Sequence, residues 1–128
     1  MKEKLEVQIS QLEKAIKRLE EALRLLPTQI HKDATIQRFE FTFELLWKTI
    51  QTFAQEKGLE AVSPKDSLRT AAQLGLIDKV EVWFDFLDAR NLSSHVYSEK
   101  VANLVYSQIK KFLPEVKKLL NRLKKENG

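Results

Sequence analysis

Apolar residues recur at alternating spacings of three and four in two long runs within the first half of this chain of 128 residues. Such spacing gathers them on one stripe of an α-helix, and that stripe must be buried against other helices. The first run comprises Leu5, Ile9, Leu12, Ile16, Leu19, Leu23 and Leu26, and the second comprises Ile36, Phe39, Phe43, Leu46, Ile50 and Phe53. Because Pro27 cannot continue the first helix, the pattern predicts two long helices packed antiparallel across a short connection.

The few glycines and prolines mark where helices begin and end. Asp33 is placed to cap the start of the second helix, and Gly58 suits the left-handed position that follows its end. Ser63 followed by Pro64 is typical of a helix start, so we expect a short helix from Pro64 to about Leu74.

Two further helices are expected in the second half of the chain, with Asp78 capping one and Ser98 beginning the other. Their expected apolar residues are Val80, Trp83, Phe84 and Leu87, then Val101, Leu104, Val105, Phe112, Val116, Leu119 and Leu123. Pro114 should bend or divide the last helix. The sequence therefore predicts an all-α protein with a single domain over residues 1–128. Its expected architecture is an antiparallel four-helix bundle with one short extra helix between the second and third long helices.

Composition excludes several kinds of chemistry. The chain has no cysteine, only two histidines, and three glycines that lie far apart, so zinc motifs and glycine-rich phosphate loops are absent. Asp85 and Asp88 could share a helix face, but no Glu-x-x-His pattern accompanies them. The carboxylate pair with which a nucleotidyltransferase holds Mg²⁺ is also missing, so the chain is not itself such a transferase. We expect no metal and no cofactor.

From the charge and hydropathy of the sequence, we expect a cytoplasmic protein. The segment MKEKLEVQISQLEK interrupts every apolar stretch with charges, which predicts neither a signal peptide nor a membrane span. The net charge is +4, and residues 110–126 contribute seven basic and two acidic side chains to it. This basic end could meet a phosphate backbone or an acidic partner, or it could be a solvated helix face that complements the helix dipole.

Two aromatic residues of the second helix, Phe41 and Trp47, fall off the buried stripe. A stacking surface for bases is one interpretation of the aromatic residues in this helix, although core packing explains those on the stripe. Large exposed apolar patches on soluble monomers usually mark contacts with another molecule. We therefore predict that the side of the helix carrying Phe41 and Trp47 meets the short third helix or a second subunit.

The segment from Asp88 to Tyr97, DARNLSSHVY, is polar where a bundle helix should continue its apolar stripe. In an uninterrupted helix, Arg90 and His95 would point about 140° apart and would not converge. They can share a site only if the helix loosens near Ser93 and Ser94, whose hydroxyls compete for backbone hydrogen bonds, or if they meet across a symmetry axis. The alternative is an ordinary ion pair of Arg90 with one of the aspartates before it.

Two segments resemble a known family. RNLSSHVY, from Arg90 to Tyr97, is similar to the R-x4-H-x-Y motif of the HEPN superfamily, and IQRFEFTFELLWKTIQ, from Ile36 to Gln51, is similar to the second-helix signature of its nucleotidyltransferase substrate-binding branch. The resemblance covers nearly the whole chain in the same helical order.

The resemblance implies a homodimeric helical subunit that works beside a minimal nucleotidyltransferase. It implies a cleft for RNA or a nucleotide with Arg90 and His95 as catalytic residues and with Asn91 and Ser94 contacting the substrate. Family members of the toxin type are metal-independent endoribonucleases, silenced when the partner transfers AMP to the motif tyrosine, here Tyr97. Imidazole exchanges protons near neutral pH and guanidinium binds phosphate, so the residue types fit this chemistry.

Two alternatives to the ribonuclease stay open. In one, the cleft is a non-catalytic binding module that presents a substrate to the partner transferase. In the other, the chain is a structural bundle whose basic last helix docks another protein. The sequence does not name the substrate either, because a short polar motif reads backbone chemistry and not base identity.

Overall fold

The computed structural model describes residues 2–127, and every regular element among them is helical. The elements are α1 (Lys2–Arg24), α2 (Gln29–Glu56), α3 (Pro64–Gln73), α4 (Val80–Leu92), a 3-10 turn η1 (Ser93–His95) and α5 (Glu99–Asn127). This order confirms the predicted all-α fold, with the short α3 lying between the second and third of the main helices.

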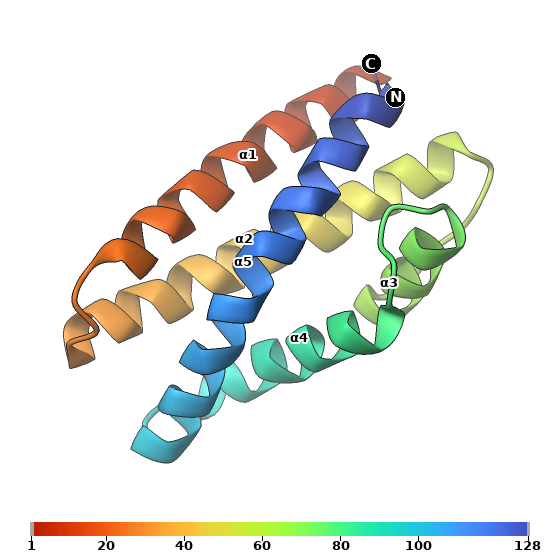
Figure 1. Ribbon diagram of the computed structural model, residues 1–128. Coiled ribbons are helices and arrows are strands. Elements are labelled where there is room, and N and C mark those ends of the chain that lie inside the picture. Colours follow the sequence, from red (N-terminus) through yellow and green to blue (C-terminus); the bar gives the residue numbers. More distant parts are fainter. Residues whose placement is uncertain (1, 128) are drawn as a thin grey trace.

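The helices are arranged as an antiparallel bundle (Figure 1). The helices α1 and α2 form an antiparallel pair, and α5 packs against both of them and against α4. The short α3 bridges α2 and α4. The first turn of α1 and the last turn of α5 lie at one end of the molecule, and the turn between α4 and α5 lies toward the other (Figure 1). The polar DARNLSSHVY segment is therefore placed at one tip of the bundle.

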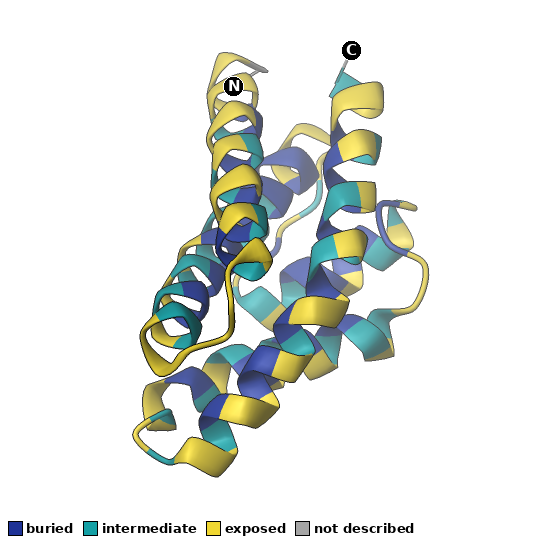
Figure 2. Cartoon of the chain, turned by 60° about the vertical axis from the view of Figure 1, so that its left-hand side comes forward, coloured by how far each residue is buried: buried dark blue, intermediate teal, exposed yellow. Residues whose placement is uncertain are grey.

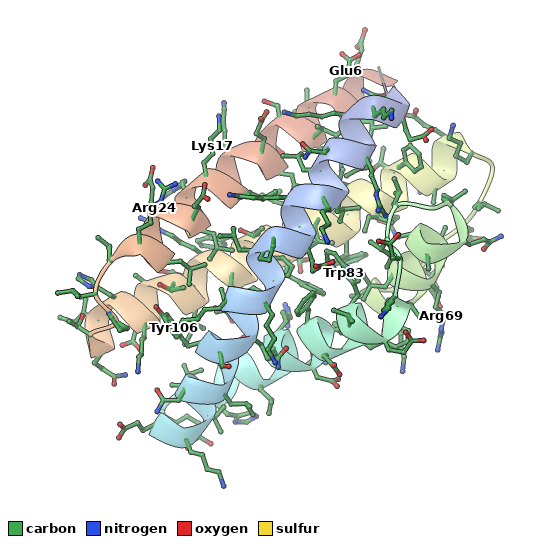
Figure 3. The ribbon with its side chains drawn as sticks, viewed as in Figure 1. Glu6, Lys17, Arg24, Arg69, Trp83 and Tyr106 are labelled. Carbon is green, nitrogen blue, oxygen red and sulfur yellow. The ribbon has the colours of Figure 1, made fainter. Side chains whose placement is uncertain are left out.

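The buried stripes face one another along the bundle, while the outer faces of the helices are exposed (Figure 2). The second predicted stripe, from Ile36 to Phe53, is buried at every one of its six positions. At the centre, Phe112 of α5 meets four aromatic rings. Trp83 is one of these and lies between the helices, whereas Lys17 and Arg69 point outward (Figure 3). Packing of aromatic rings thus joins α2, α4 and α5.

Several expected boundaries are correct because they depend on neighbouring residues alone. Ser63 caps α3 by accepting a hydrogen bond from the Asp66 amide at 3.1 Å, with Pro64 in the first turn. Gly58 and Gly75 both have φ of 78°, the left-handed conformation that ends α2 and α3 at little cost for glycine. Ser98 accepts from the Val101 amide at 3.4 Å and so begins α5 as predicted.

Two predicted caps are wrong. Asp33 lies inside α2, which begins four residues earlier because Thr28 accepts a hydrogen bond from the His31 amide at 3.2 Å. Asp78 does not cap α4 either, since Lys79 occupies the cap position and makes no side-chain hydrogen bond there. The carboxylate of Asp78 is held instead by Arg122 of α5.

The apolar stripes also differ from expectation at their ends. Leu26 is 77% exposed because α1 has already ended at Arg24, and Leu104 is 51% exposed. In α4 the buried positions are Trp83, Phe86 and Ala89, while the predicted Phe84 and Leu87 are only half-buried. Pro114 does not divide α5, which is continuous from Glu99 to Asn127.

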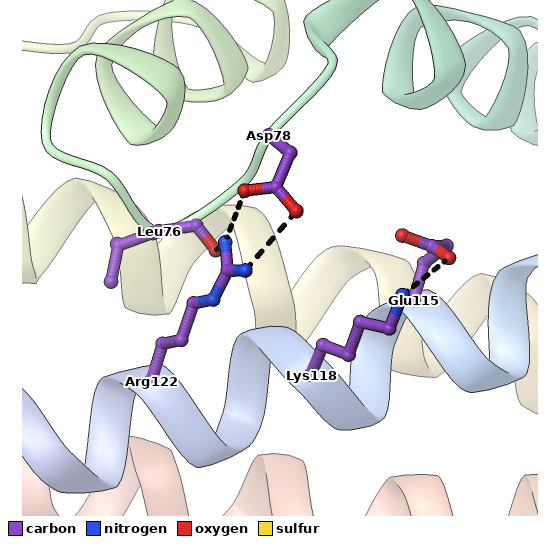
Figure 4. A network of polar contacts seen from close by, with 5 residues as sticks. All are labelled: Leu76, Asp78, Glu115, Lys118 and Arg122. Carbon is purple, nitrogen blue, oxygen red and sulfur yellow. Dashed lines mark hydrogen bonds and ion pairs between the residues drawn. The ribbon is translucent and has the colours of Figure 1, made fainter.

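The bidentate ion pair between Arg122 and Asp78 ties α5 to the loop before α4 (Figure 4). The two nitrogen–oxygen distances are 3.0 and 3.1 Å, and the same guanidinium donates to the Leu76 carbonyl at 3.2 Å. The hydrogen bonds and positive charge of Arg122 lower the pKa of Asp78, and the same contact raises the pKa of Arg122. The stability that this long-range ion pair contributes to the folded chain therefore depends on pH.

A pKa lowered by folding means that Asp78 stabilises the folded chain above its unfolded pKa, near 3.9, and that this contribution is lost as the pH falls through the folded value. We expect Asp78→Asn to lower the urea midpoint of unfolding at pH 7 and to leave it nearly unchanged near pH 2. The difference should be small, because the pair is solvent-exposed. Asp85→Asn removes another exposed aspartate and serves as control. An equal difference at both pH values would contradict the assignment.

Candidate functional site

The candidate site occupies the turn that joins α4 to α5. Arg90 lies in the last turn of α4, His95 closes the 3-10 turn η1, and Tyr97 lies in the short connection before α5. The backbone changes from α to 3-10 geometry after Leu92, at the two serines where a loosened turn was one of the two alternatives left open by the sequence. The motif is therefore not one continuous helix.

The serine hydroxyls supply the physical reason for this change. Ser93 Oγ donates to the Arg90 carbonyl at 2.6 Å, and Ser94 Oγ donates to the Asn91 carbonyl at 3.3 Å. These hydrogen bonds satisfy carbonyl groups at the end of α4 that a continuing helix would otherwise bond. Asn91 and Ser94 are exposed, so their remaining polar groups face solvent at the tip of the bundle.

Two glutamates of α2 contact polar side chains of this turn and of the end of α4. Glu40 Oε2 lies 2.7 Å from Ser93 Oγ and shares its single hydroxyl proton with the Arg90 carbonyl, and Glu44, one helical turn further on, lies 3.7 Å from Arg90 Nη2. The helical pattern of the sequence indicates neither contact, and from the sequence the alternative partner of Arg90 is an aspartate of α4. The sequence feature that could have indicated these contacts is the pair Glu40 and Glu44, which lie four residues apart and off the buried stripe of the second helix.

Glu44 is a shared acceptor. Its Oε2 also accepts from Trp47 Nε1 at 3.1 Å, and its Oε1 lies 3.2 Å from Lys48 Nζ. Partial burial by itself raises the pKa of Glu44, but the hydrogen bonds of Trp47 and Lys48 and the charges of Lys48 and Arg90 outweigh it, so the pKa lies below its ordinary value. The group is thus a carboxylate at neutral pH. Arg90 remains 42% exposed beside it and keeps N–H groups that face solvent.

His95 and Tyr97 form a second contact in the same turn. Nδ1 of His95 lies 3.3 Å from Tyr97 Oη, and the two rings meet edge to face with centroids 5.9 Å apart. Tyr97 is 86% exposed, and His95 is exposed as well. When Nδ1 carries the proton and donates to Tyr97 Oη, the lone pair of Nε2 is free to accept a proton from a substrate.

The structure brings the predicted site residues to one tip of the molecule in two separate contacts. Arg90 faces Glu44, and His95 faces Tyr97. Neither a hydrogen bond nor an ion pair joins Arg90 to His95 within residues 2–127 of one chain. The imidazole is not packed in hydrocarbon, and the guanidinium is held by a single carboxylate that it shares with Trp47 and Lys48.

Other candidate features are occupied by structural contacts. Of the basic residues near the end of α5, Lys117 pairs with Glu20, Lys118 with Glu115, Arg122 with Asp78 and Lys124 with Glu13. These pairs favour the interpretation of this end as a solvated helix face. Asp85 and Asp88 line a groove of about 170 Å³ between α4 and α5, and nowhere in residues 2–127 do three potential metal ligands gather.

The predicted contact of Phe41 with the short third helix is not found. Trp47 is half-buried against the core, whereas Phe41 remains 56% exposed, so α3 does not cover it. Whether a second subunit does so stays a prediction. None of the described helices combines the length and the apolar character that crossing a membrane requires.

Fold and site together define a class of small helical bundles with an Arg-x4-His-x-Tyr turn between the last two main helices. A family model described as "Nucleotidyltransferase substrate binding protein like" matches residues 7–125. The chain belongs to this family, the HepT-like branch of the HEPN superfamily.

Similar proteins agree with this assignment. "Probable ribonuclease HepT" of Haemophilus influenzae is 38% identical over an alignment of 97 residues. The match covers 72% of this chain and 66% of that protein, just under two thirds of its length. A crystal structure of a protein from Thermus thermophilus has a TM-score of 0.83 at 35% identity and covers 88% of this chain and 98% of its own. HI0074 from Haemophilus influenzae, described as revealing the fold of a substrate-binding domain of a nucleotidyltransferase, has a TM-score of 0.64 at 30% identity, with 97% and 99% covered.

Proposed function

We propose that the chain is the HEPN-type subunit of a two-component nucleotidyltransferase system and that the turn around Arg90 and His95 binds RNA and cleaves it without a metal. The observation that carries the proposal is the exposed His95 ring, 3.3 Å from Tyr97 Oη, on the turn that begins beside the partly exposed Arg90. The name of the HepT relative supports the ribonuclease, and the family description supports the transferase partner.

The proposed reaction uses the ribose as nucleophile. His95 Nε2 takes the proton of a 2′-hydroxyl, and the 2′ oxygen then bonds to the adjacent phosphorus while the bond from phosphorus to the 5′ oxygen breaks. The imidazolium returns a proton to the departing 5′ oxygen, so the products are a 2′,3′-cyclic phosphate and a 5′-hydroxyl. Arg90 stabilises the negative charge that builds on the phosphate oxygens during the reaction.

A second copy of the chain completes the proposed cleft. In one chain Arg90 faces Glu44, whereas His95 faces Tyr97, so the two groups act on one phosphate most directly if turns from two copies lie side by side. This arrangement corresponds to the symmetry-axis alternative derived from the sequence. Light scattering after size-exclusion chromatography measures the dimer directly.

The test of the proposed function is cleavage of a labelled RNA in the presence of EDTA by protein purified without its partner. Cleavage by the wild type that is lost in both Arg90→Ala and His95→Ala supports the ribonuclease. Complete absence of cleavage by pure wild-type protein that still binds RNA supports the alternative, a non-catalytic module that presents substrate to the transferase. The description of HI0074 as a substrate-binding domain favours that second candidate.

Tyr97 is the proposed site of regulation by AMP transfer. Its exposed Oη would give up its proton to solvent and attack the α-phosphorus of ATP bound by the partner, forming an O–P bond while the bond to the departing pyrophosphate breaks. The added phosphate would lie beside His95, because Oη is 3.3 Å from Nδ1, and its negative charge would repel an RNA phosphate.

We therefore expect incubation with the partner, ATP and Mg²⁺ to add one adenylyl mass to the wild type and none to Tyr97→Phe. Tyr106→Phe is the matched control, since Tyr106 is the other tyrosine of the chain and is buried. The modified wild type should lose RNA cleavage, while unmodified Tyr97→Phe should retain part of it. Intact-mass spectrometry makes the measurement, and an adenylyl group that persists in Tyr97→Phe would move the target to another residue.

A further inference from the structure

A groove between α1 and α2 lies outside the motif turn. Its volume is about 440 Å³, and it is lined by Gln11, Lys14, Ala15, Arg18, Arg38, Phe41, Glu44 and Leu45. Phe41 presents its ring here and is 56% exposed, although it is one of the largest apolar side chains in the protein. A concave, mainly apolar groove with a few charged side chains around it is typical of a binding site.

The charged side chains around the groove are mostly cationic. Lys14 and Arg18 come from α1 and are exposed, and Arg38 comes from α2. Arg38 Nη1 donates to the Arg18 carbonyl at 2.6 Å and lies 3.8 Å from Glu21, so its guanidinium bridges the two helices with other N–H groups left over. Glu44 is the one carboxylate in the lining, and Lys48 and Arg90 already balance its charge.

Glu44 also connects the groove to the motif turn. The same carboxylate that lines the groove lies 3.7 Å from Arg90 Nη2. The groove therefore opens directly beside the guanidinium that is proposed to bind the scissile phosphate. A ligand long enough to extend past Glu44 can touch both surfaces at once.

We propose that the groove binds a single-stranded segment of RNA next to the cleaved phosphate, with one base stacked on Phe41 and the backbone phosphates on Lys14, Arg18 and Arg38. An aromatic platform beside a cationic track is the arrangement with which proteins hold single strands without selecting their sequence. This inference rests on the proposed RNA binding and adds to it a second contact, on a different pair of helices from the motif turn.

Charge argues against a second copy of the chain as the occupant. A twofold contact centred on this groove would place Lys14, Arg18 and Arg38 opposite the same three cations of the other copy. Desolvating like charges against one another is unfavourable, whereas a nucleic acid strand supplies one negative charge per nucleotide. The second subunit predicted for Phe41 is thus the competing occupant that the experiment must exclude.

The experiment measures binding of a fluorescein-labelled single-stranded RNA by anisotropy, in EDTA and in a His95→Gln background that prevents cleavage. Phe41→Ala should weaken binding about 5- to 100-fold, and Phe41→Trp should preserve it. The logarithm of the affinity falls as the logarithm of the salt concentration rises. Arg18→Gln should make this slope less steep by about 0.7, the value for one lost phosphate contact on a single strand. The controls are Leu104→Ala, which is 51% exposed on α5, and Lys111→Gln, also on α5, and neither should change binding.

Four outcomes decide the matter. Weaker binding in Phe41→Ala with unchanged controls supports the inference, even if the wild type proves not to cleave RNA. RNA binding that is the same in Phe41→Ala and in the parent overturns the inference and leaves the proposed function standing. An absence of RNA binding in the parent overturns both. Light scattering that finds Phe41→Ala reduced to a smaller species than the parent assigns the groove to a second copy and overturns the inference as well.

Discussion

Replacing His95 by glutamine is expected to lower the rate of RNA cleavage by about 10²- to 10⁴-fold, the usual contribution of a general acid or base. Glutamine retains a hydrogen-bonding group of similar reach, so the contact with Tyr97 Oη can persist. It cannot take up and return a proton near neutral pH, however, and the 2′-hydroxyl then loses its base. The affinity for RNA should change far less than the rate, because Arg90 and the groove cations remain.

The measurement is a single-turnover cleavage rate with protein in excess over labelled RNA, in EDTA, which separates the chemical step from product release. His31→Gln is the matched control, since His31 is the other histidine of the chain. It lies in the first turn of α2, and its Nδ1 is 2.6 Å from the carbonyl oxygen of Leu26 in the connection between α1 and α2. Cleavage by His95→Gln at the wild-type rate, or an equal loss in His31→Gln, would remove His95 from the proposed mechanism.

Features that depend on adjacent residues were predictable from the sequence. The stripe from Ile36 to Phe53 is buried throughout because a regular helix fixes which residues share a face. The cap at Ser63 and the left-handed Gly58 are correct for the same reason, since each is decided within a few residues. The loosened turn at Ser93 was one of two alternatives left open by the sequence, and the structure shows it, with the Ser93 hydroxyl bonded to the backbone of its own turn.

Features that depend on distant residues were not predictable in this way. Asp78 has the side chain of a helix cap, but Arg122, 44 residues further along the chain, competes for its carboxylate. The hold of Glu40 on Ser93, across 53 residues, requires knowing how α2 packs beside α4, and periodicity does not contain that information. The same packing brings Glu44 beside Arg90, and so places the groove that Glu44 lines next to the Arg90 guanidinium.

The aromatic cluster around Phe112 supports the packing that positions these residues. Phe112 is 0% exposed, and its ring centroid lies 5.0 Å from Phe39, 5.3 Å from Phe86, 5.8 Å from Trp83 and 6.2 Å from Phe43. Most of these rings meet edge to face, the orientation that adds electrostatic attraction to the burial of apolar surface. The cluster thereby fixes α4, and with it the motif turn, against α2 and α5.

Phe112→Ala is expected to lower the free energy of unfolding by about 3–5 kcal/mol, because it removes a buried ring and leaves a cavity among four rings that cannot all move inward. Phe41→Ala removes the same atoms from a position that is 56% exposed, and its effect should stay within about 0.5 kcal/mol. Urea unfolding followed by circular dichroism, at one fixed protein concentration, compares the two variants. Equal losses would mean that Phe41 is covered in solution by another copy of the chain, whereas a small loss for Phe112→Ala would contradict the described core.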